Sequence, residues 1–146
     1  MSYSSLHMHF VFATQHRCAW IDVSWRPRLY EYMGGTIRGL GGVSQGIGGI
    51  EDHIHLLVGL KPTHRISDFM RELKKTASIW VHEQIGISQF AWQDGYGAFS
   101  VSPTARSSVK RYIANQVEHH KHQTSRDEFI QMLMASGIEF DPQYIE

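Results

Sequence analysis

The sequence predicts an α+β fold, in which a four-stranded antiparallel sheet carries helices on one face and is followed by an added C-terminal helix. Short segments with alternating apolar residues indicate strands, and longer segments with apolar residues three or four apart indicate helices. Their order is strand, helix, strand, strand, helix, strand. This βαββαβ order is that of the ferredoxin-like, split-βαβ plan. We therefore expect one domain over residues 1–146, with its core complete by about residue 102.

The strands have distinct signals. Apolar side chains alternate from Leu6 to Phe12 in the first strand. The second strand is rich in glycine and joins the third through a tight turn, which favours a hairpin. A phosphate-binding loop is the weaker interpretation, because no Gly-Lys-Ser/Thr element or helix follows directly. The four strands are expected at residues 3–14, 43–50, 51–60 and 98–101.

The helices follow from apolar spacing and from the residues that bound them. Pro27 suits the first turn of the first helix, and a clear apolar stripe runs from Ile66 to Val81 in the second. Pro103 opens the third helix, which is the added one. The helices are expected at residues 25–40, 66–86, 104–122 and 126–135, with an acidic tail at 136–146.

His53 and His55 lie two residues apart in the third strand, so their imidazoles point to the same side of the sheet. Ile54 and the other even-numbered apolar residues point into the core and fix the strand. Two imidazoles at this spacing are able to hold one metal ion. His7 and His9 repeat the spacing in the first strand, where a polar strand face is the simpler explanation.

Composition indicates an ordinary soluble globular chain. Of 146 residues, 42% are hydrophobic and 19% charged. No apolar run is long enough to span a membrane, and the N-terminus lacks a signal-peptide pattern, so we expect a cytoplasmic protein. The single cysteine, Cys18, excludes an intrachain disulfide and a thiolate metal cluster.

The charge is unevenly distributed although the net charge is zero. Residues 1–126 hold all 14 Lys and Arg and 9 Asp and Glu, a net charge of +5, whereas the last 20 residues carry −5. A basic body with an acidic tail is compatible with a polyanionic partner such as a nucleic acid.

Tyr112 and Gln116 are four residues apart in the third predicted helix, so they share one face beside its apolar stripe. His119 and His120 follow one turn later. A tyrosine brought against histidines and a metal ion suits phosphoryl transfer, because the metal offsets charge on the phosphodiester while the tyrosine oxygen attacks phosphorus. Each residue alone is typical of packing, but their co-occurrence favours chemistry.

Three blocks of sequence resemble the single-tyrosine HUH transposase family, where U is a bulky apolar residue. They are H-I-H at 53–55, W-Q-D-G-Y-G-A-F-S at 92–100 and Y-I-A-N-Q-V-E-H-H at 112–120. The likeness extends from the first strand to about His122. That family mobilises small insertion sequences and includes relatives associated with repetitive extragenic palindromes.

The resemblance implies a transposase that cleaves and rejoins single-stranded DNA at hairpins at transposon ends. Tyr112 would be the nucleophile, forming a 5′-phosphotyrosine link and leaving a free 3′-hydroxyl. His53 and His55 would bind a divalent ion, Mg²⁺ or Mn²⁺, and Gln116 would complete its coordination. The resemblance further implies a homodimer in which the tyrosine helix can reach the other subunit's histidines. It also implies activity at the nucleoid of a bacterial or archaeal cell.

Several side chains are candidates for contacts with DNA. Trp92 and Tyr96 either stack on bases or pack in the core. The basic candidates for phosphate contacts are Arg71, Lys74 and Lys75 in the second helix, Arg17 in the loop after the first strand, and Lys110 and Arg111 beside Tyr112.

Two other functions remain compatible with the sequence. A non-catalytic module that binds single-stranded nucleic acid is the first, because this fold commonly displays its sheet to single strands. A hydrolase that uses a metal at His53 and His55 to activate water is the second. A covalent adduct between DNA and Tyr112 would distinguish the transposase from both.

Overall fold

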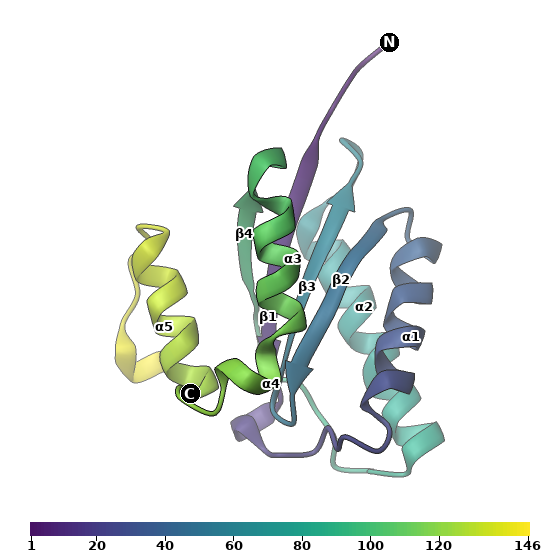
Figure 1. Cartoon of the computed structure of the whole chain (residues 1–146). Coiled ribbons are helices and arrows are strands. Elements are labelled where there is room, and N and C mark those ends of the chain that lie inside the picture. The colour runs from purple at the N-terminus through teal and green to yellow at the C-terminus, as the bar shows by residue number, and fades with distance from the viewer.

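A computed structural model describes all 146 residues, and its centre is a four-stranded antiparallel sheet (Figure 1). The strands are β1 (Leu6–Ala13), β2 (Val43–Ile50), β3 (His53–Leu60) and β4 (Gly97–Val101). They lie in the order β2-β3-β1-β4, the order of the ferredoxin-like plan. Central strands β1 and β3 pair along their whole length, from Leu6 opposite Leu60 to Ala13 opposite His53. The predicted fold class is confirmed.

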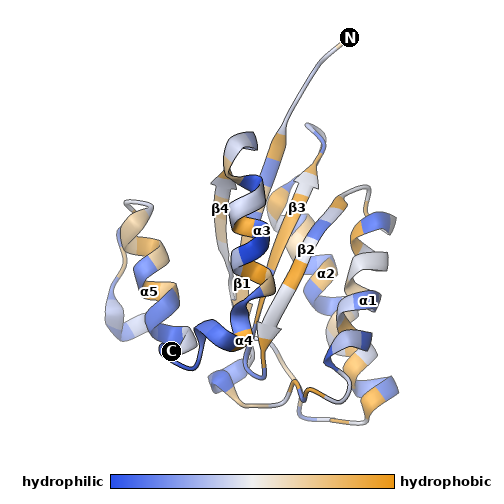
Figure 2. Cartoon of the chain, in the orientation of Figure 1, coloured by the Kyte–Doolittle hydropathy of each residue, from blue (hydrophilic) through white to orange (hydrophobic).

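Two helices, α1 (Arg26–Gly39) and α2 (Ile66–Trp80), cover one face of the sheet (Figure 1). Each apolar side chain buried between sheet and helices contributes about 1.5–3 kcal/mol, so the alternation along β3 decides which of its faces meets the core. In Figure 2 orange segments run along β1 and β3. The main residues of this core are Phe10, Phe12, Ile54, Leu56, Val58, Leu29, Met33, Ile37, Phe69, Met70 and Leu73.

A third helix, α3 (Arg106–Ala114), lies on the opposite face of the sheet, against β2 and β3 (Figure 1). Ile113 is its buried residue. A Cβ atom at Gly48 of β2 would overlap the carbonyl oxygen of Ile113 and lie 3.0 Å from its Cγ2 atom. The missing side chain at Gly48 therefore sets how closely the α3 backbone approaches the sheet.

The continuous helix predicted over residues 104–122 is wrong. A 3₁₀ turn at Pro103–Ala105 precedes α3, and Asn115 leaves helical geometry with φ −99° and ψ 20°. A short helix, α4 (Gln116–His119), follows. No proline or glycine marks the break. Asn115 is the only sequence signal for the break, and it is weak. Asparagine side chains compete with the helix for local backbone hydrogen bonds.

The chain continues into α5 (Ser125–Ala135), which begins where Thr124 accepts a hydrogen bond from the backbone N–H of Asp127. The acidic tail then folds back. Its backbone is held by Arg126, whose guanidinium donates to the carbonyls of Ile145 at 2.9 Å and Pro142 at 3.1 Å. Every helix of the protein is too short or too polar to cross a membrane.

Candidate active site

β3 holds His53 and His55 side by side on the sheet face opposite the apolar core. Ile54 between them is fully buried in that core, so the alternation of the strand turns both imidazoles away from α1 and α2. Both histidines are at most 1% exposed, and their ring centroids are 5.0 Å apart. The predicted orientation of the pair is confirmed.

His53 is hydrogen-bonded through both ring nitrogens. Nδ1 donates to Asp52 Oδ1 at 2.8 Å, and Nε2 donates to Gln116 Oε1 at 2.9 Å. Burial opposes a charge on this ring, but the carboxylates of Asp52 and Glu128 outweigh burial and raise the pKa of His53 to about 9. A carboxylate behind Nδ1 is the usual way to orient a metal-binding histidine, because it aims Nε2 into the site.

His55 has a different environment. Its Nε2 donates to Glu128 Oε1 at 2.8 Å, and its Nδ1 lies 2.8 Å from His9 Nε2 of the neighbouring strand β1. Burial lowers the pKa of His55 to about 4, and burial together with the nearby His55 lowers the pKa of His9 to about 3. The carboxylate of Asp52 thus orients His53, and the neutral imidazole of His9 orients His55.

Glu128 enters this cluster from α5 and lies at its centre, 2% exposed. Its Oε1 accepts from His55 and lies 3.2 Å from His120 Nε2, while its Oε2 accepts from the Tyr112 hydroxyl. Burial alone would raise the pKa of Glu128, but hydrogen bonds with His120, His53 and His55 hold it well below the usual range. An ionised carboxylate therefore lies among the histidines and beside the tyrosine.

Tyr112, in the last turn of α3, extends over the cluster. Its ring contacts His55 and His119 edge to face, with centroids 5.8 Å and 5.3 Å apart. Burial and the hydrogen bond to Glu128 raise the pKa of Tyr112 well above its usual range, so the phenol keeps its proton in the metal-free protein. The residue also lines a surface hollow with Arg111 and His119, which leaves it accessible from outside.

The donor atoms fit a divalent metal ion. Imidazole nitrogens with carboxylate and amide oxygens are typical ligands of such ions, and His53 has the carboxylate partner at Nδ1 that metal-binding histidines usually have. Gln116 Oε1 adds a further donor, 2.9 Å from His53 Nε2 and 2.8 Å from His120 Nε2. Four side chains offer ligand atoms within 4.8 Å of one another: His53, His55, His120 and Glu128. This set is larger than the three ligands predicted from the sequence.

The structure brings together the four side chains that the sequence singled out, Tyr112, His53, His55 and Gln116. Gln116 is 1% exposed and reaches the cluster from α4, since the helix break at Asn115 separates it from Tyr112. Its amide oxygen meets His53, and its Nε2 donates to Glu128 Oε2 at 3.1 Å.

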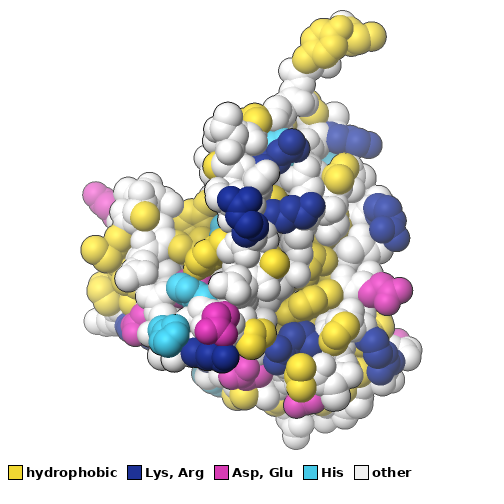
Figure 3. Space-filling model, in the orientation of Figure 1, with side chains coloured by type: hydrophobic (Ala, Val, Ile, Leu, Met, Phe, Trp, Pro, Cys, Tyr) yellow, Lys and Arg dark blue, Asp and Glu magenta, His cyan; other side chains and the backbone are white.

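The predicted DNA contacts fall in separate places. Lys110 and Arg111 are exposed on α3 beside Tyr112, where Figure 3 shows Lys and Arg side chains gathered over α3 and β2. Arg71, Lys74 and Lys75 lie on α2, which covers the opposite face of the sheet. DNA held at the histidines would have to pass the sheet edge to reach them.

Three of these basic residues already have partners inside the protein. Arg71 donates to Asp68 Oδ1 at 3.0 Å. The Lys74 ammonium donates to the carbonyl oxygens of Gln93 and Gly95 at 2.8 Å and 2.7 Å. Arg17 donates to Ser125 Oγ at 2.7 Å, close to the histidine cluster. DNA contact stays a prediction for all six basic residues.

Sequence reasoning missed Glu128 and left His9 and His120 without a role. Glu128 lies in the first turn of α5, where acidic residues are common because they favour the positive end of the helix dipole. The repeated His-x-His spacing was the available signal for His9. Only the pairing of β1 with β3, which sets His9 opposite Leu57, brings its ring to His55.

A tyrosine hydroxyl thus lies beside a buried cluster of potential metal ligands on an antiparallel ferredoxin-like sheet. Residues 2–116 match the family described as Transposase IS200 like, and the chain belongs to this family. The matched part includes both strand histidines and Tyr112. It ends at Gln116, so α5 and Glu128 lie outside it.

Among known proteins, the transposases for insertion sequence element IS200 of Salmonella typhimurium and Salmonella typhi are each 33% identical over 76 residues. That segment is 48% of this chain and 49% of each relative, so the chain spans about half the length of the curated relatives it matches.

Two solved structures share the fold. A putative transposase of Deinococcus radiodurans R1 has a TM-score of 0.66 at 24% identity, covering 79% of this chain and 93% of that one. A REP-associated tyrosine transposase bound to a REP hairpin has a TM-score of 0.61 at 16% identity, and the match covers 100% of this chain and 89% of that one.

Proposed function

We propose that the protein is a metal-dependent transposase that cleaves and rejoins single-stranded DNA through Tyr112. One observation carries the proposal: Tyr112, His53 and His55 converge on the buried carboxylate of Glu128. A candidate nucleophile within hydrogen-bonding reach of a metal-ligand set is the arrangement that covalent phosphoryl transfer requires. Membership of the IS200-like transposase family supports the same class of reaction.

In the proposed reaction the Tyr112 oxygen attacks phosphorus in line with the departing 3′ oxygen. A bond from phosphorus to the tyrosine forms, the bond to the 3′ oxygen breaks, and the phenolic proton ends on that oxygen. The products are a 5′-phosphotyrosine and a free 3′-hydroxyl. Attack of a 3′-hydroxyl on the phosphotyrosine rejoins the DNA and restores Tyr112.

Each side chain of the cluster has a proposed role. Glu128 positions the Tyr112 oxygen, while His53, His55 and Gln116, with His120 and Glu128 as added donors, would hold Mg²⁺ or Mn²⁺. When bound, the ion supplies Lewis acidity at a phosphoryl oxygen and offsets the negative charge that develops there. Asp52 and His9 keep the two strand histidines aimed into the site.

We propose single-stranded DNA with a hairpin at a transposon end as the substrate. The solved REP-associated tyrosine transposase is described as bound to a REP hairpin, which supports a hairpin ligand for this fold. Arg106, Lys110 and Arg111 are exposed along α3. A phosphate backbone that follows these cations would pass Tyr112.

The Tyr112 hydroxyl meets Glu128 and the histidines of its own chain. This geometry supports cleavage in cis. The homodimer expected from the family resemblance would not need to exchange α3 for a first cleavage, and an exchange would require release of the hydrogen bond to Glu128.

The test uses 3′-labelled single-stranded DNA from the flanks of the protein's own gene, with Mg²⁺ or Mn²⁺, on a denaturing gel. We expect labelled DNA that migrates with the protein, requires metal and disappears in Tyr112→Phe. Tyr32→Phe, at a partly exposed tyrosine of α1, is the matched control and should keep the adduct. Cleaved DNA without an adduct would favour a hydrolase, and binding without cleavage would favour a binding module.

A further inference from the structure

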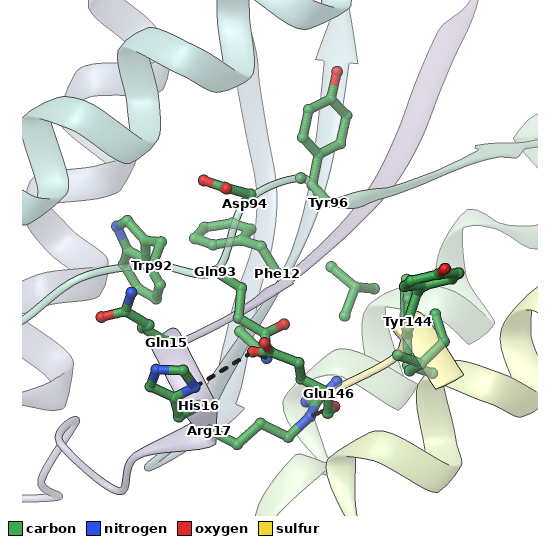
Figure 4. A pocket seen from close by; sticks show the side chains of 15 residues that line it. Phe12, Gln15, His16, Arg17, Trp92, Gln93, Asp94, Tyr96, Tyr144 and Glu146 are labelled. Carbon is green, nitrogen blue, oxygen red and sulfur yellow. Dashed lines mark hydrogen bonds and ion pairs between the residues drawn. The ribbon is translucent and has the colours of Figure 1, made fainter. Parts of the chain in front are cut away.

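A cavity is linked to the histidine cluster through Ser125 and Asp52. It measures about 430 Å³ and lies between the end of β1, the loop of residues 92–96, α5 and the folded-back tail (Figure 4). Its volume falls within the usual range for small-ligand pockets. Its walls include the side chains of Phe12, Arg17, Trp92, Tyr96, Phe129 and Tyr144.

Tyr96, Phe129 and Tyr144 keep exposed aromatic surface at the cavity, whereas Trp92 belongs to the apolar core and is 9% exposed. Trp92 is fixed by an edge-to-face contact with Phe12, with centroids 4.7 Å apart, and by a hydrogen bond from Nε1 to the Lys74 carbonyl at 3.1 Å. Tyr144 is 75% exposed and stands at the other side of the cavity (Figure 4). Stacking between aromatic side chains is how proteins hold unpaired bases without reading their sequence.

The floor of the cavity holds one guanidinium, that of Arg17, and is built at a conformational cost. His16 and Arg17 both adopt left-handed backbone geometry, with φ 55° and 51°. Non-glycine residues in this region cost of order 1–3 kcal/mol each and cluster at functional sites. Figure 4 shows both side chains directed toward Glu146, whose carboxylate accepts from Gln93 Nε2 at 3.1 Å and lies 3.8 Å from His16 Nδ1. These donors thus already hold an anionic group.

A chain of hydrogen bonds joins the cavity to the histidine cluster. Arg17 donates to Ser125 Oγ at 2.7 Å, and Ser125 donates to Asp52 Oδ2 at 3.0 Å. Asp52 in turn accepts from His53 at 2.8 Å. Arg17, which lines the cavity, is thus linked to His53 through only two side chains, Ser125 and Asp52.

We propose that this cavity binds one unpaired nucleotide of the single-stranded DNA next to the cleaved phosphodiester. The base lies between the aromatic walls. Its phosphate takes the place of the Glu146 carboxylate beside His16 and of the Glu146 main-chain oxygen at Arg17, and Gln93 and Asp94 offer hydrogen bonds to the base edge. Neither wall nor floor alone selects a nucleotide, but together they match its flat ring and its charge. The inference rests on the proposed function for the identity of the ligand.

The test measures binding without cleavage, in Tyr112→Phe protein with EDTA. The probe is a fluorescein-labelled hairpin from the flank of the gene with four unpaired nucleotides on each side, together with versions in which each unpaired nucleotide in turn is abasic. We expect one abasic position to weaken binding about fivefold or more. Tyr144→Ala should weaken binding of the intact probe by a similar factor and remove the effect of that abasic position. Tyr32→Ala on α1 should change neither.

Cross-linking gives a second measurement that does not depend on the Tyr144 variant. Thymidine with a 4-thio group at the sensitive position should cross-link to peptides containing residues 92–96 or Tyr144. The inference is overturned if every abasic position acts equally in Tyr112→Phe protein with and without Tyr144→Ala, or if cross-links map only to α3.

This result is separable from the proposed function. If wild-type protein forms no adduct with DNA but the abasic effect and its loss in Tyr144→Ala persist, the nucleotide site stands and the tyrosine chemistry fails. If the adduct forms and the abasic effect is absent, the tyrosine chemistry stands and the nucleotide site fails.

Discussion

The hydroxyl of Tyr112 on α3 donates a hydrogen bond to the carboxylate of Glu128 on α5. The same carboxylate accepts from His55 at 2.8 Å and from Gln116 at 3.1 Å. One buried anion therefore sets the positions of the candidate nucleophile and of two candidate metal ligands. The match to the transposase family ends at Gln116, so this contact joins Tyr112 of the matched part to a residue beyond it.

Replacing Glu128 should lower the affinity for a divalent metal ion while the protein stays folded. Glu128→Gln keeps the size of the side chain but removes the charge that four histidines surround, so we expect Mn²⁺ affinity to fall by about 10- to 100-fold, measured by calorimetry. Asp127→Asn is the control, because Asp127 is exposed and contacts none of the histidines. Equal affinities in both variants would show that Glu128 is no part of the metal site.

His9 should affect metal binding by orienting the ring of His55. His9→Phe removes the partner of His55 Nδ1 and leaves a buried polar atom unpaired, which costs about 1–3 kcal/mol in the free energy of unfolding. The His55 ring is then free to turn, and we expect about a tenfold or greater loss of Mn²⁺ affinity. His7→Phe tests specificity, since His7 bonds to Gln45 and Ser5 instead. If both variants bind metal as the wild type does, His9 does not orient His55.

Gly48 should control the distance between Tyr112 and the histidines. Gly48→Ala would force α3 away from β2, at a cost of about 1–3 kcal/mol in stability, and a shift of about 1 Å at the nucleophile can reduce the rate about 100-fold. Gly46→Ala is a matched control on the same strand, because the nearest atom to its added methyl is Lys110 Cγ at 3.7 Å. We expect Gly48→Ala to form the adduct about 100-fold more slowly than Gly46→Ala. Equal rates would mean that α3 adjusts without moving Tyr112.

Metal affinity should rise with pH. The pKa of His53 is raised to about 9 in the metal-free protein, so below pH 9 this ring must lose a proton when Nε2 binds an ion. His55, with its pKa lowered to about 4, is already neutral. We expect about a tenfold gain in Mn²⁺ affinity per pH unit between pH 6.5 and 8.5, with release of about one proton.

Calorimetry in buffers of different ionisation heat measures that proton directly. In Asp52→Asn the pKa of His53 should fall, because one of the two carboxylates that raise it is gone, and the rise in affinity should level off at lower pH. A pH-independent affinity in the wild type would contradict the assigned charge of His53.

Local pattern was sufficient to predict the sheet and half of the site. The alternation around Ile54 predicts both the core face of β3 and the common direction of His53 and His55, because strand geometry alone fixes the face on which each residue lies. The four-residue spacing of Tyr112 and Gln116 survives the break at Asn115, since both still point toward the sheet.

The remainder of the site depends on contacts between distant segments. Glu128 meets His55 across 73 residues, and His9 meets it across 46. Nothing near Glu128 in the sequence distinguishes it from an ordinary acidic residue in the first turn of a helix. The left-handed geometry of Arg17 is equally invisible, because arginine does not favour it, and His16 gives only the weak signal that histidine adopts positive φ more often than most residues.

The most direct test of the central claim identifies the atom that attacks DNA. Adduct formed with Mn²⁺ and single-stranded DNA from the flanks of the gene is digested with protease and nuclease and analysed by tandem mass spectrometry. We predict a 5′-linked phosphonucleotide on Tyr112 and on no other residue. A nucleotide on a different side chain, or cleaved DNA with a free 5′-phosphate and unmodified Tyr112, would contradict the account.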